Sequence, residues 1–154
     1  MLKINYIVIP LITIFVSVCG SWVVGNGMDW YNNLHLSSIV PEGYVIGIVW
    51  TIIFILSAIS ALLFYNKFPR DKIFKWVVFL FLLNAFLNVF WNFLFFGWHL
   101  LLLSFIEMIL LEVTVVALIF LLWRKVPWAG ILLIPYALWV PFATYLTWLV
   151  IQLN

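Results

Sequence analysis

Five long runs of apolar residues, separated by short polar breaks, decide what this chain can fold into. Each run holds about 20 residues, the length that an α-helix needs to cross the hydrocarbon core of a bilayer. Only 8% of the 154 residues are charged and 68% are hydrophobic, whereas a soluble domain carries about 25% charged residues. So short a chain cannot bury this much apolar surface within itself. The sequence therefore predicts one all-α integral membrane domain over residues 1–154.

The runs predict a bundle of five transmembrane helices. Their expected bounds are residues 6–24, 45–65, 76–96, 100–123 and 128–153. Within the last run, Pro135 and Pro141 each remove a backbone hydrogen bond, which predicts kinks. In the first run, Ser17, Ser21 and Gly25 recur every four residues and predict a face that packs closely, either within the bundle or against a second copy. A signal peptide is the alternative interpretation of the first run, but the run is long for that purpose.

The basic residues all fall on one side of this arrangement. They precede the first helix or lie in the breaks at 66–72 and 124–127 and beside them. With five spans these places share one side of the membrane, so the positive-inside rule predicts a cytoplasmic N-terminus and an outside C-terminus. We expect a bacterial cell membrane, and the net charge of +2 is too small to indicate a nucleic-acid partner. The residues are Lys3, Lys67, Arg70, Lys72, Lys75, Arg124 and Lys125.

Polar and aromatic side chains gather in the outer half of the predicted spans. Counting 1.5 Å per residue from the span ends puts residues of four helices at one depth. These rings and polar groups indicate a cavity between helices, with ordinary bundle packing as the alternative. An ionisable group in a span is a functional candidate, so Glu107 must face a cavity or hydrogen-bond a neighbouring helix, and Glu112 is expected to be neutral or helix-bonded. The residues at this depth are Trp50, Asn88, Trp91, Glu107 and Trp139.

Several motifs follow one another along nearly the whole chain. They are Trp30-Tyr31 followed by Leu34, VIGIVWTIIF at 45–54, LNVFWNFLFFG at 87–97 and LLIPYALWVPFATYL at 132–146. In this order and spacing they resemble the translocator protein family, also called TspO/MBR or tryptophan-rich sensory proteins. The resemblance implies a five-helix membrane bundle, commonly a homodimer, with a pocket opening toward the first loop.

The resemblance also implies a ligand. Family members bind porphyrins, including protoporphyrin IX and haem, and some bind sterols or isoquinoline carboxamides. Glu107 stands where the family often has an aspartate. The first loop at 36–42 keeps one of the family's three prolines and lacks its tryptophan, and no basic residue follows Tyr145 to complete a sterol motif. The ligand-binding positions that the resemblance implies, with Glu107, are Tyr31, Pro41, Trp50, Phe54, Asn88, Trp91, Trp139 and Ala143.

We therefore expect a membrane receptor, sensor or carrier for porphyrins or similar flat ligands, with no required cofactor and no metal site. The alternative is an enzyme that degrades porphyrin under light, with Trp50 and Trp139 as catalytic candidates. A structural protein whose cavity is only packing is a third possibility. Of three asparagines at four-residue spacing, we expect Asn88 to meet a ligand's polar edge, and Asn84 and Asn92 to bond neighbouring helices.

Overall fold

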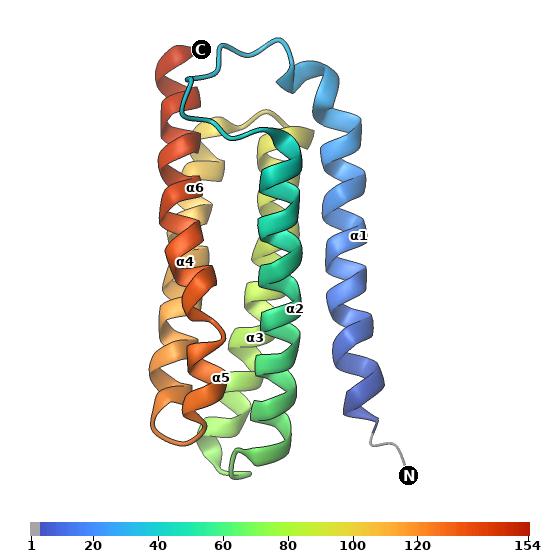
Figure 1. The fold of residues 1–154 in the computed structure, drawn as a ribbon, viewed down its shortest axis with the longest axis vertical. Helices are drawn as coiled ribbons and strands as arrows, with labels where there is room; N and C mark the ends of the chain where they lie inside the picture. Colours follow the sequence, from blue (N-terminus) through green and yellow to red (C-terminus); the bar gives the residue numbers. More distant parts are fainter. Residues whose placement is uncertain (1–3) are drawn as a thin grey trace.

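A computed structural model of the chain describes residues 4–154, which form a bundle of long helices (Figure 1). Five segments are long and apolar enough to cross a membrane. The predicted all-α membrane fold with five spans is therefore confirmed. The elements are α1 (Asn5–Tyr31), α2 (Gly43–Lys67), α3 (Lys72–Asn92), the π-helical turn η1 (Phe93–Gly97), α4 (Leu101–Trp123), α5 (Pro127–Ile131) and α6 (Ile134–Leu153).

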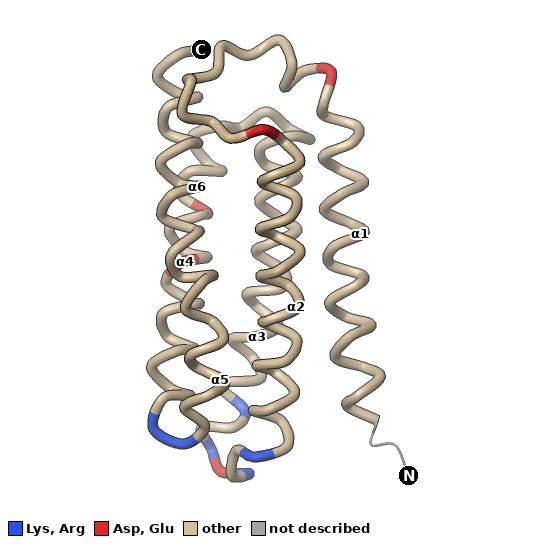
Figure 2. Tube along the Cα trace, in the orientation of Figure 1, with Lys and Arg blue, Asp and Glu red and all other residues tan. Residues whose placement is uncertain are grey.

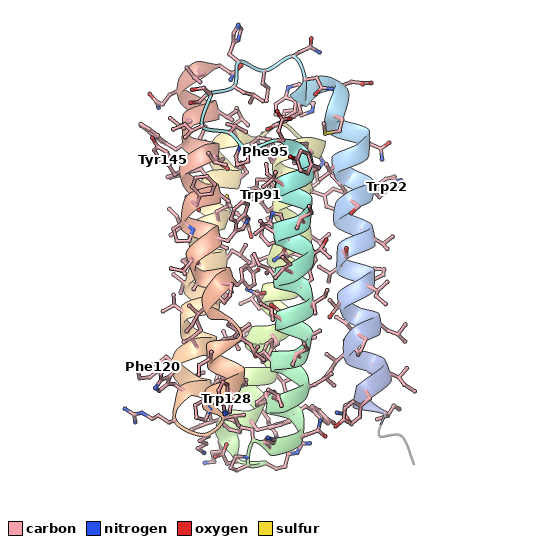
Figure 3. All side chains as sticks on the ribbon, viewed as in Figure 1. Trp22, Trp91, Phe95, Phe120, Trp128 and Tyr145 are labelled. Atoms are coloured by element: carbon pink, nitrogen blue, oxygen red, sulfur yellow. The ribbon has the colours of Figure 1, made fainter. Side chains whose placement is uncertain are left out.

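The spans form a closed ring whose order differs from their order in the chain. α1 packs on α2, α3 and η1, while α4 packs on α3, α5 and α6. α2 closes the ring by packing on α5. The outside of the ring carries large apolar side chains such as Trp22 and Phe120, which point away from the bundle in Figure 3. In water such a surface would be unstable, so the exterior is the face that meets lipid.

The first helix runs further than the sequence predicted. We expected it to end at residue 24, but α1 continues to Tyr31 because Gly27 lets it lie directly against η1. A Cβ atom built on Gly27 would stand 2.6 Å from the Phe96 carbonyl oxygen. Gly27 is thus a site of close helix packing, and the glycines at 25 and 27 do not break the helix.

The small-residue face predicted on α1 does not pack closely within the bundle, and its alternative, a contact with a second copy, stays a prediction. Ser21 and Gly25 are exposed, and a Cβ added to Gly25 would meet nothing within 4 Å. The buried face carries Gly20 and Gly27 instead; at Gly20 the side-chain nitrogen of Asn92 lies 3.1 Å from a built Cβ. Spacing alone identified a stripe of small residues but did not identify which stripe faces the bundle.

The last span is divided into two helices. α5 ends at Ile131 and α6 begins at Ile134, so Pro135 falls in the first turn of α6. A proline there removes no helical hydrogen bond, because the first turn has no partner for its N–H groups. The predicted distortion at Pro135 therefore takes the form of a break just before it. α5 is joined to α2 by the buried Ser60 hydroxyl, which donates to the Ala129 carbonyl at 2.7 Å.

The basic residues that the structure describes gather at one end of the bundle, here called the basic end (Figure 2). At this end Lys125 pairs with Asp71 and its ammonium lies over the Phe68 ring. The hydrogen bond from Lys125 holds the pKa of the Asp71 carboxyl below its usual value. The opposite end carries the first loop, residues 32–42, and is called the loop end. Lys3 lies outside the described residues.

Candidate functional site

A cavity of about 480 Å³ lies toward the loop end of the bundle and is called the loop-end cavity. α1, α2, α3, η1, α4 and α6 all contribute side chains to it. Its volume falls in the range of about 300–1,000 Å³ that small-molecule sites occupy. The aromatic side chains that line it are Tyr31, Trp50, Phe54, Trp91, Phe95, Phe96 and Trp139.

These rings contact one another and form the walls of the cavity. Trp91 stacks on Phe95 with ring centroids 5.1 Å apart and an interplanar angle of 20°; both are labelled inside the bundle in Figure 3. Trp50 meets Tyr136 edge-on at 5.8 Å. The indole nitrogens of Trp91 and Trp139 are buried and have no hydrogen-bond partner among residues 4–154. The cavity thus has flat apolar walls, and two of its lining residues carry N–H donors that have no acceptor in the described chain.

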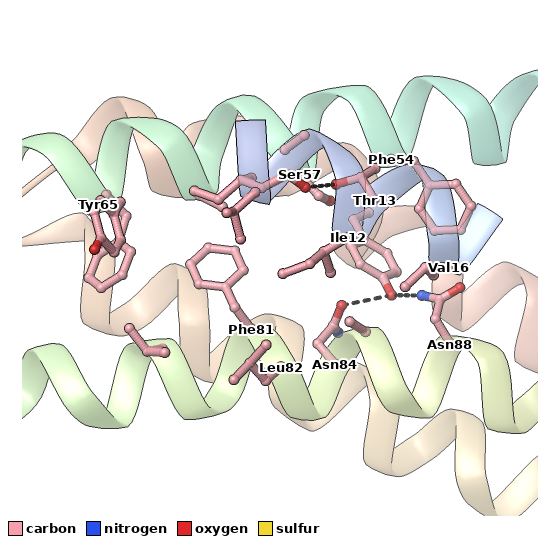
Figure 4. A pocket seen from close by; sticks show the side chains of 18 residues that line it. Ile12, Thr13, Val16, Phe54, Ser57, Tyr65, Phe81, Leu82, Asn84 and Asn88 are labelled. Carbon is pink, nitrogen blue, oxygen red and sulfur yellow. Dashed lines mark hydrogen bonds between the residues drawn. The ribbon is translucent and has the colours of Figure 1, made fainter. Parts of the chain in front are cut away.

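A buried hydrogen-bond network adjoins the cavity at Asn88, the one member of the network that lines the cavity. The Tyr136 hydroxyl donates to the Asn84 side-chain oxygen at 3.2 Å and accepts a hydrogen bond from the Asn88 side-chain nitrogen (Figure 4). Asn84 also donates to the Thr114 hydroxyl at 2.9 Å. The expected helix-to-helix role of Asn84 is therefore confirmed, since it joins α3 to α4 and α6. Asn92 instead donates to the Asn88 carbonyl of its own helix at 2.8 Å, so that expectation for Asn92 is wrong.

The structure brings together seven of the nine side chains implied by the resemblance. Pro41 is not in the lining, although its neighbour Val40 is. Glu107 is also absent from it, because α4 turns Met108 and Leu111 to the cavity instead. Whether any of the nine binds a ligand stays a prediction. Those lining the cavity are Tyr31, Trp50, Phe54, Asn88, Trp91, Trp139 and Ala143.

The two carboxyl groups of α4 remain without hydrogen bonds in the described chain. Glu107 is 3% exposed, and neither of its carboxyl oxygens has a partner among residues 4–154. The expected bond from Glu107 to a neighbouring helix is therefore not formed. One oxygen of Glu112 is likewise buried and unpartnered. A carboxyl group in such surroundings is stable only in its neutral form, because a charge without partner or water is costly.

The first loop covers the loop end of the cavity. Figure 1 shows it leaving α1, crossing to the end of α6 and returning to α2. It is held at the crossing by Asn154, whose side chain accepts from the His35 backbone N–H at 2.9 Å and donates to the His35 carbonyl at 3.1 Å. At its start, Trp30 stacks on His99 with ring centroids 4.0 Å apart. These contacts hold a loop that lacks most of the prolines expected from the resemblance.

Three side chains of this site were assigned no role from the sequence. Tyr136 hydrogen-bonds Asn84 and Asn88 beside the cavity, and Phe95 and Phe96 extend the aromatic wall. All three lie within motifs that the sequence displays, so the motifs were the available signal. Their roles depend on which way each ring points, and η1 changes that direction for Phe95 and Phe96 by inserting a π-helical turn.

Comparison with known proteins gives one consistent answer. The sequence model of the TspO/MBR family matches residues 7–153. The tryptophan-rich protein TspO of Bacillus cereus is 35% identical over 125 residues, which are 81% of this chain and 80% of that protein. A protein of the same name from Chlorobaculum tepidum is 31% identical over 90% of this chain and 89% of its own length. Protein CrtK of Rhodobacter capsulatus is 31% identical over 81% of this chain and 78% of its own.

Proposed function

The chain belongs to the TspO/MBR family of membrane proteins, and from this premise we propose that its loop-end cavity binds a porphyrin or a similar flat, largely apolar ligand. The observation that carries the proposal is the wall of aromatic rings from α1, α2, α3, η1 and α6 around about 480 Å³ of space. A planar conjugated ligand gains both burial of its faces and ring stacking from such walls.

The polar groups of the cavity support the same ligand class. The unpartnered indole N–H groups of Trp91 and Trp139 are donors, and a porphyrin carries carboxylate acceptors at its edge. A ligand acceptor that paired with either donor would satisfy a group that is unpaired in the described chain, and such a hydrogen bond contributes about 0.5–1.5 kcal/mol. The cavity therefore favours a flat ligand with acceptors over a plain hydrocarbon.

A titration with protoporphyrin IX tests the proposal. Purified protein in lipid nanodiscs is expected to show saturable quenching of tryptophan fluorescence, with one site per chain. Empty nanodiscs and nanodiscs holding an unrelated membrane protein are the controls, because porphyrins partition into lipid. Quenching that rises in proportion to porphyrin in all three samples would rule the proposal out.

A second function is favoured by the position of Trp50 and Trp139 on the same cavity. Indole is readily oxidised, so a light-excited porphyrin held between these rings has electron donors beside it. For a photochemical enzyme, Trp50→Phe and Trp139→Phe should keep porphyrin affinity within a few-fold but lose most light-dependent bleaching, measured by the Soret band under illumination. If bleaching is equal in wild type and variants, the protein binds porphyrin without transforming it, which is the result we expect.

We further propose that the basic end faces the cytoplasm, which places the first loop and residue 154 outside. The separation of basic residues in Figure 2 supports this orientation. In a Cys19→Ala background, a cysteine replacing Ser38 should react with a membrane-impermeant maleimide on intact cells, whereas one replacing Lys72 should react only after lysis. The reverse pattern would invert the orientation.

A further inference from the structure

A second hollow lies beside the first half of α1. It has a volume of about 240 Å³ and lies between α1, α2 and α3, from Tyr65 at one end to Asn88 at the other (Figure 4). We call it the basic-end groove. Its side chains are largely apolar and include Val8, Ile12, Ala58, Ala61, Leu82 and Ala85.

The groove exists because the first half of α1 stands away from the bundle. Figure 1 shows α1 leaning outward toward its N-terminus, and no residue between Asn5 and Val16 is buried. Val8 and Leu82, on the two helices that border the opening, are 42% and 52% exposed. The groove is therefore open along its side to the surrounding lipid.

The length of the groove matches one leaflet of a bilayer. Its lining on α2 extends from Phe54 to Tyr65, which at 1.5 Å per residue is about 17 Å. The hydrocarbon core of a bilayer is about 30 Å thick, so this is about half. The groove runs from the basic end to the middle of the membrane, as a lipid chain of that leaflet does.

Positive and hydrogen-bonding groups surround the end of the groove near Tyr65. The Arg70 guanidinium lies over the Tyr65 ring, 4.2 Å from its centroid, and over the Phe74 ring at 4.0 Å. Lys75 is exposed and stands one turn before the lining residue Val78, on the same face of α3. Asn5 stands one turn before the lining residue Ile9.

Each helix that lines the groove therefore has a polar group at or beside this end. Asn5 is 5% exposed, and its side-chain nitrogen has no hydrogen-bond partner among residues 4–154. Arg70 holds its place by donating to the Tyr65 carbonyl at 2.8 Å and keeps further N–H groups for an anion. Arg70 and Lys75 therefore offer two cations to an anion at this end.

The polar side chains deeper in the groove do not demand a polar ligand. Asn84, Asn88 and Tyr136 bond to one another, and the Thr13 hydroxyl donates to the Ile9 carbonyl at 3.0 Å. The Ser57 hydroxyl has no partner in the described chain, but a serine in a helix can turn to the carbonyl four residues earlier. An apolar chain can therefore fill the groove without leaving a new polar group unpaired.

We propose that the basic-end groove binds one acyl chain of an anionic phospholipid, whose phosphate is held by Arg70 and Lys75. The groove adjoins the loop-end cavity at Val16, Phe54 and Asn88, but the proposal does not depend on what that cavity binds. A lipid held here occupies the space between the first half of α1 and its neighbours α2 and α3. It thereby supplies packing that the protein itself does not provide.

Native mass spectrometry with two added lipids tests the site. Dioleoyl phosphatidylglycerol and dioleoyl phosphatidylcholine carry the same chains and differ in head-group charge. Wild type should retain one phosphatidylglycerol in preference to phosphatidylcholine. Arg70→Gln and Lys75→Gln should each weaken phosphatidylglycerol binding roughly fivefold with little effect on phosphatidylcholine. Arg124→Gln is the matched control, because Arg124 lies at the same end of the bundle over Phe120, outside the groove, and should change neither.

A substitution that fills the groove tests separately whether the acyl chain binds there. Ala58→Phe should reduce retention of both lipids about tenfold, whereas Ala143→Phe, in the loop-end cavity, should not. If Ala58→Phe fails to fold, Ala85→Leu fills the same groove from α3. Equal loss in Arg124→Gln would reduce the preference to a general effect of surface charge. Full lipid retention in a folded, groove-filled variant would overturn the site.

Discussion

Replacing Gly27 by alanine is expected to lower the free energy of unfolding by about 1–3 kcal/mol. The added Cβ would stand 2.6 Å from the Phe96 carbonyl oxygen and 2.7 Å from the Phe96 Cβ. The carbonyl belongs to the backbone of η1 and cannot rotate away, so α1 and η1 must move apart. The loss should be measured by SDS titration of the purified protein in mixed micelles, followed by circular dichroism.

Gly25 provides the matched control two residues earlier in the same helix. A Cβ there meets nothing within 4 Å, so Gly25→Ala should raise the free energy of unfolding by about 0.5–1 kcal/mol through helix propensity alone. Gly20→Ala should lie between the two, because its neighbour is the flexible end of the Asn92 side chain at 3.1 Å. Equal stability of the Gly25 and Gly27 variants would show that α1 does not pack on η1 as described.

Ala143→Phe is expected to weaken porphyrin binding by roughly 10- to 100-fold, because it places a phenyl ring in the space that the ligand would occupy. Ala143 lies one turn from Trp139 on α6, and both line the loop-end cavity. The affinity should be measured by the protoporphyrin titration in nanodiscs, together with the thermal unfolding midpoint of each variant.

Leu138→Phe controls for the same added ring on the same helix. Leu138 is 71% exposed on the lipid-facing side of α6, so this variant should bind like wild type. Unchanged affinity in a folded Ala143→Phe protein would move the porphyrin site out of the cavity. Loss of affinity in both variants would point to a general effect on α6.

The five spans were predictable because hydrophobic length is a property of each segment alone. The end of α1 was not, since glycines and polar residues after Val24 are typical of a break. Gly27 is helical because of its contact with Phe96, which lies 69 positions further along the chain. Only the tertiary structure shows that pairing.

The sequence predicted how deep in the membrane the site residues lie, but it did not predict which side of its helix each residue faces. Counting residues along each helix put Trp50, Trp91 and Trp139 at one predicted level, and the structure places all three on one cavity. The same count included Glu107, which shares that depth but faces away from the cavity. Rotation about a helix axis is set by the neighbours, and an almost uniformly apolar helix gives no polar face from which to infer it.

The basic-end groove had no signal in the sequence. Ser57 and Ala61 are small residues four positions apart in α2, and both line open space in the structure. Small residues at helical spacing are compatible both with close helix packing and with the wall of a groove. The difference lies in the tilt of α1 away from α2, which no local pattern in either helix specifies.

The ring order of the spans has a consequence for biosynthesis. During translation α2 is synthesised early and α5 near the end of the chain. The neighbour α1 is therefore available to α2 long before its other neighbour, α5, has been made. Until then the Ser60 hydroxyl, which is fully buried in the finished bundle and bonded to Ala129, faces lipid or water. A nascent chain that stalls after Trp123 is therefore an open arc with an unsealed flank, the kind of intermediate that quality-control proteases and insertion chaperones recognise. The ring can close only after residues 127–131 have been synthesised.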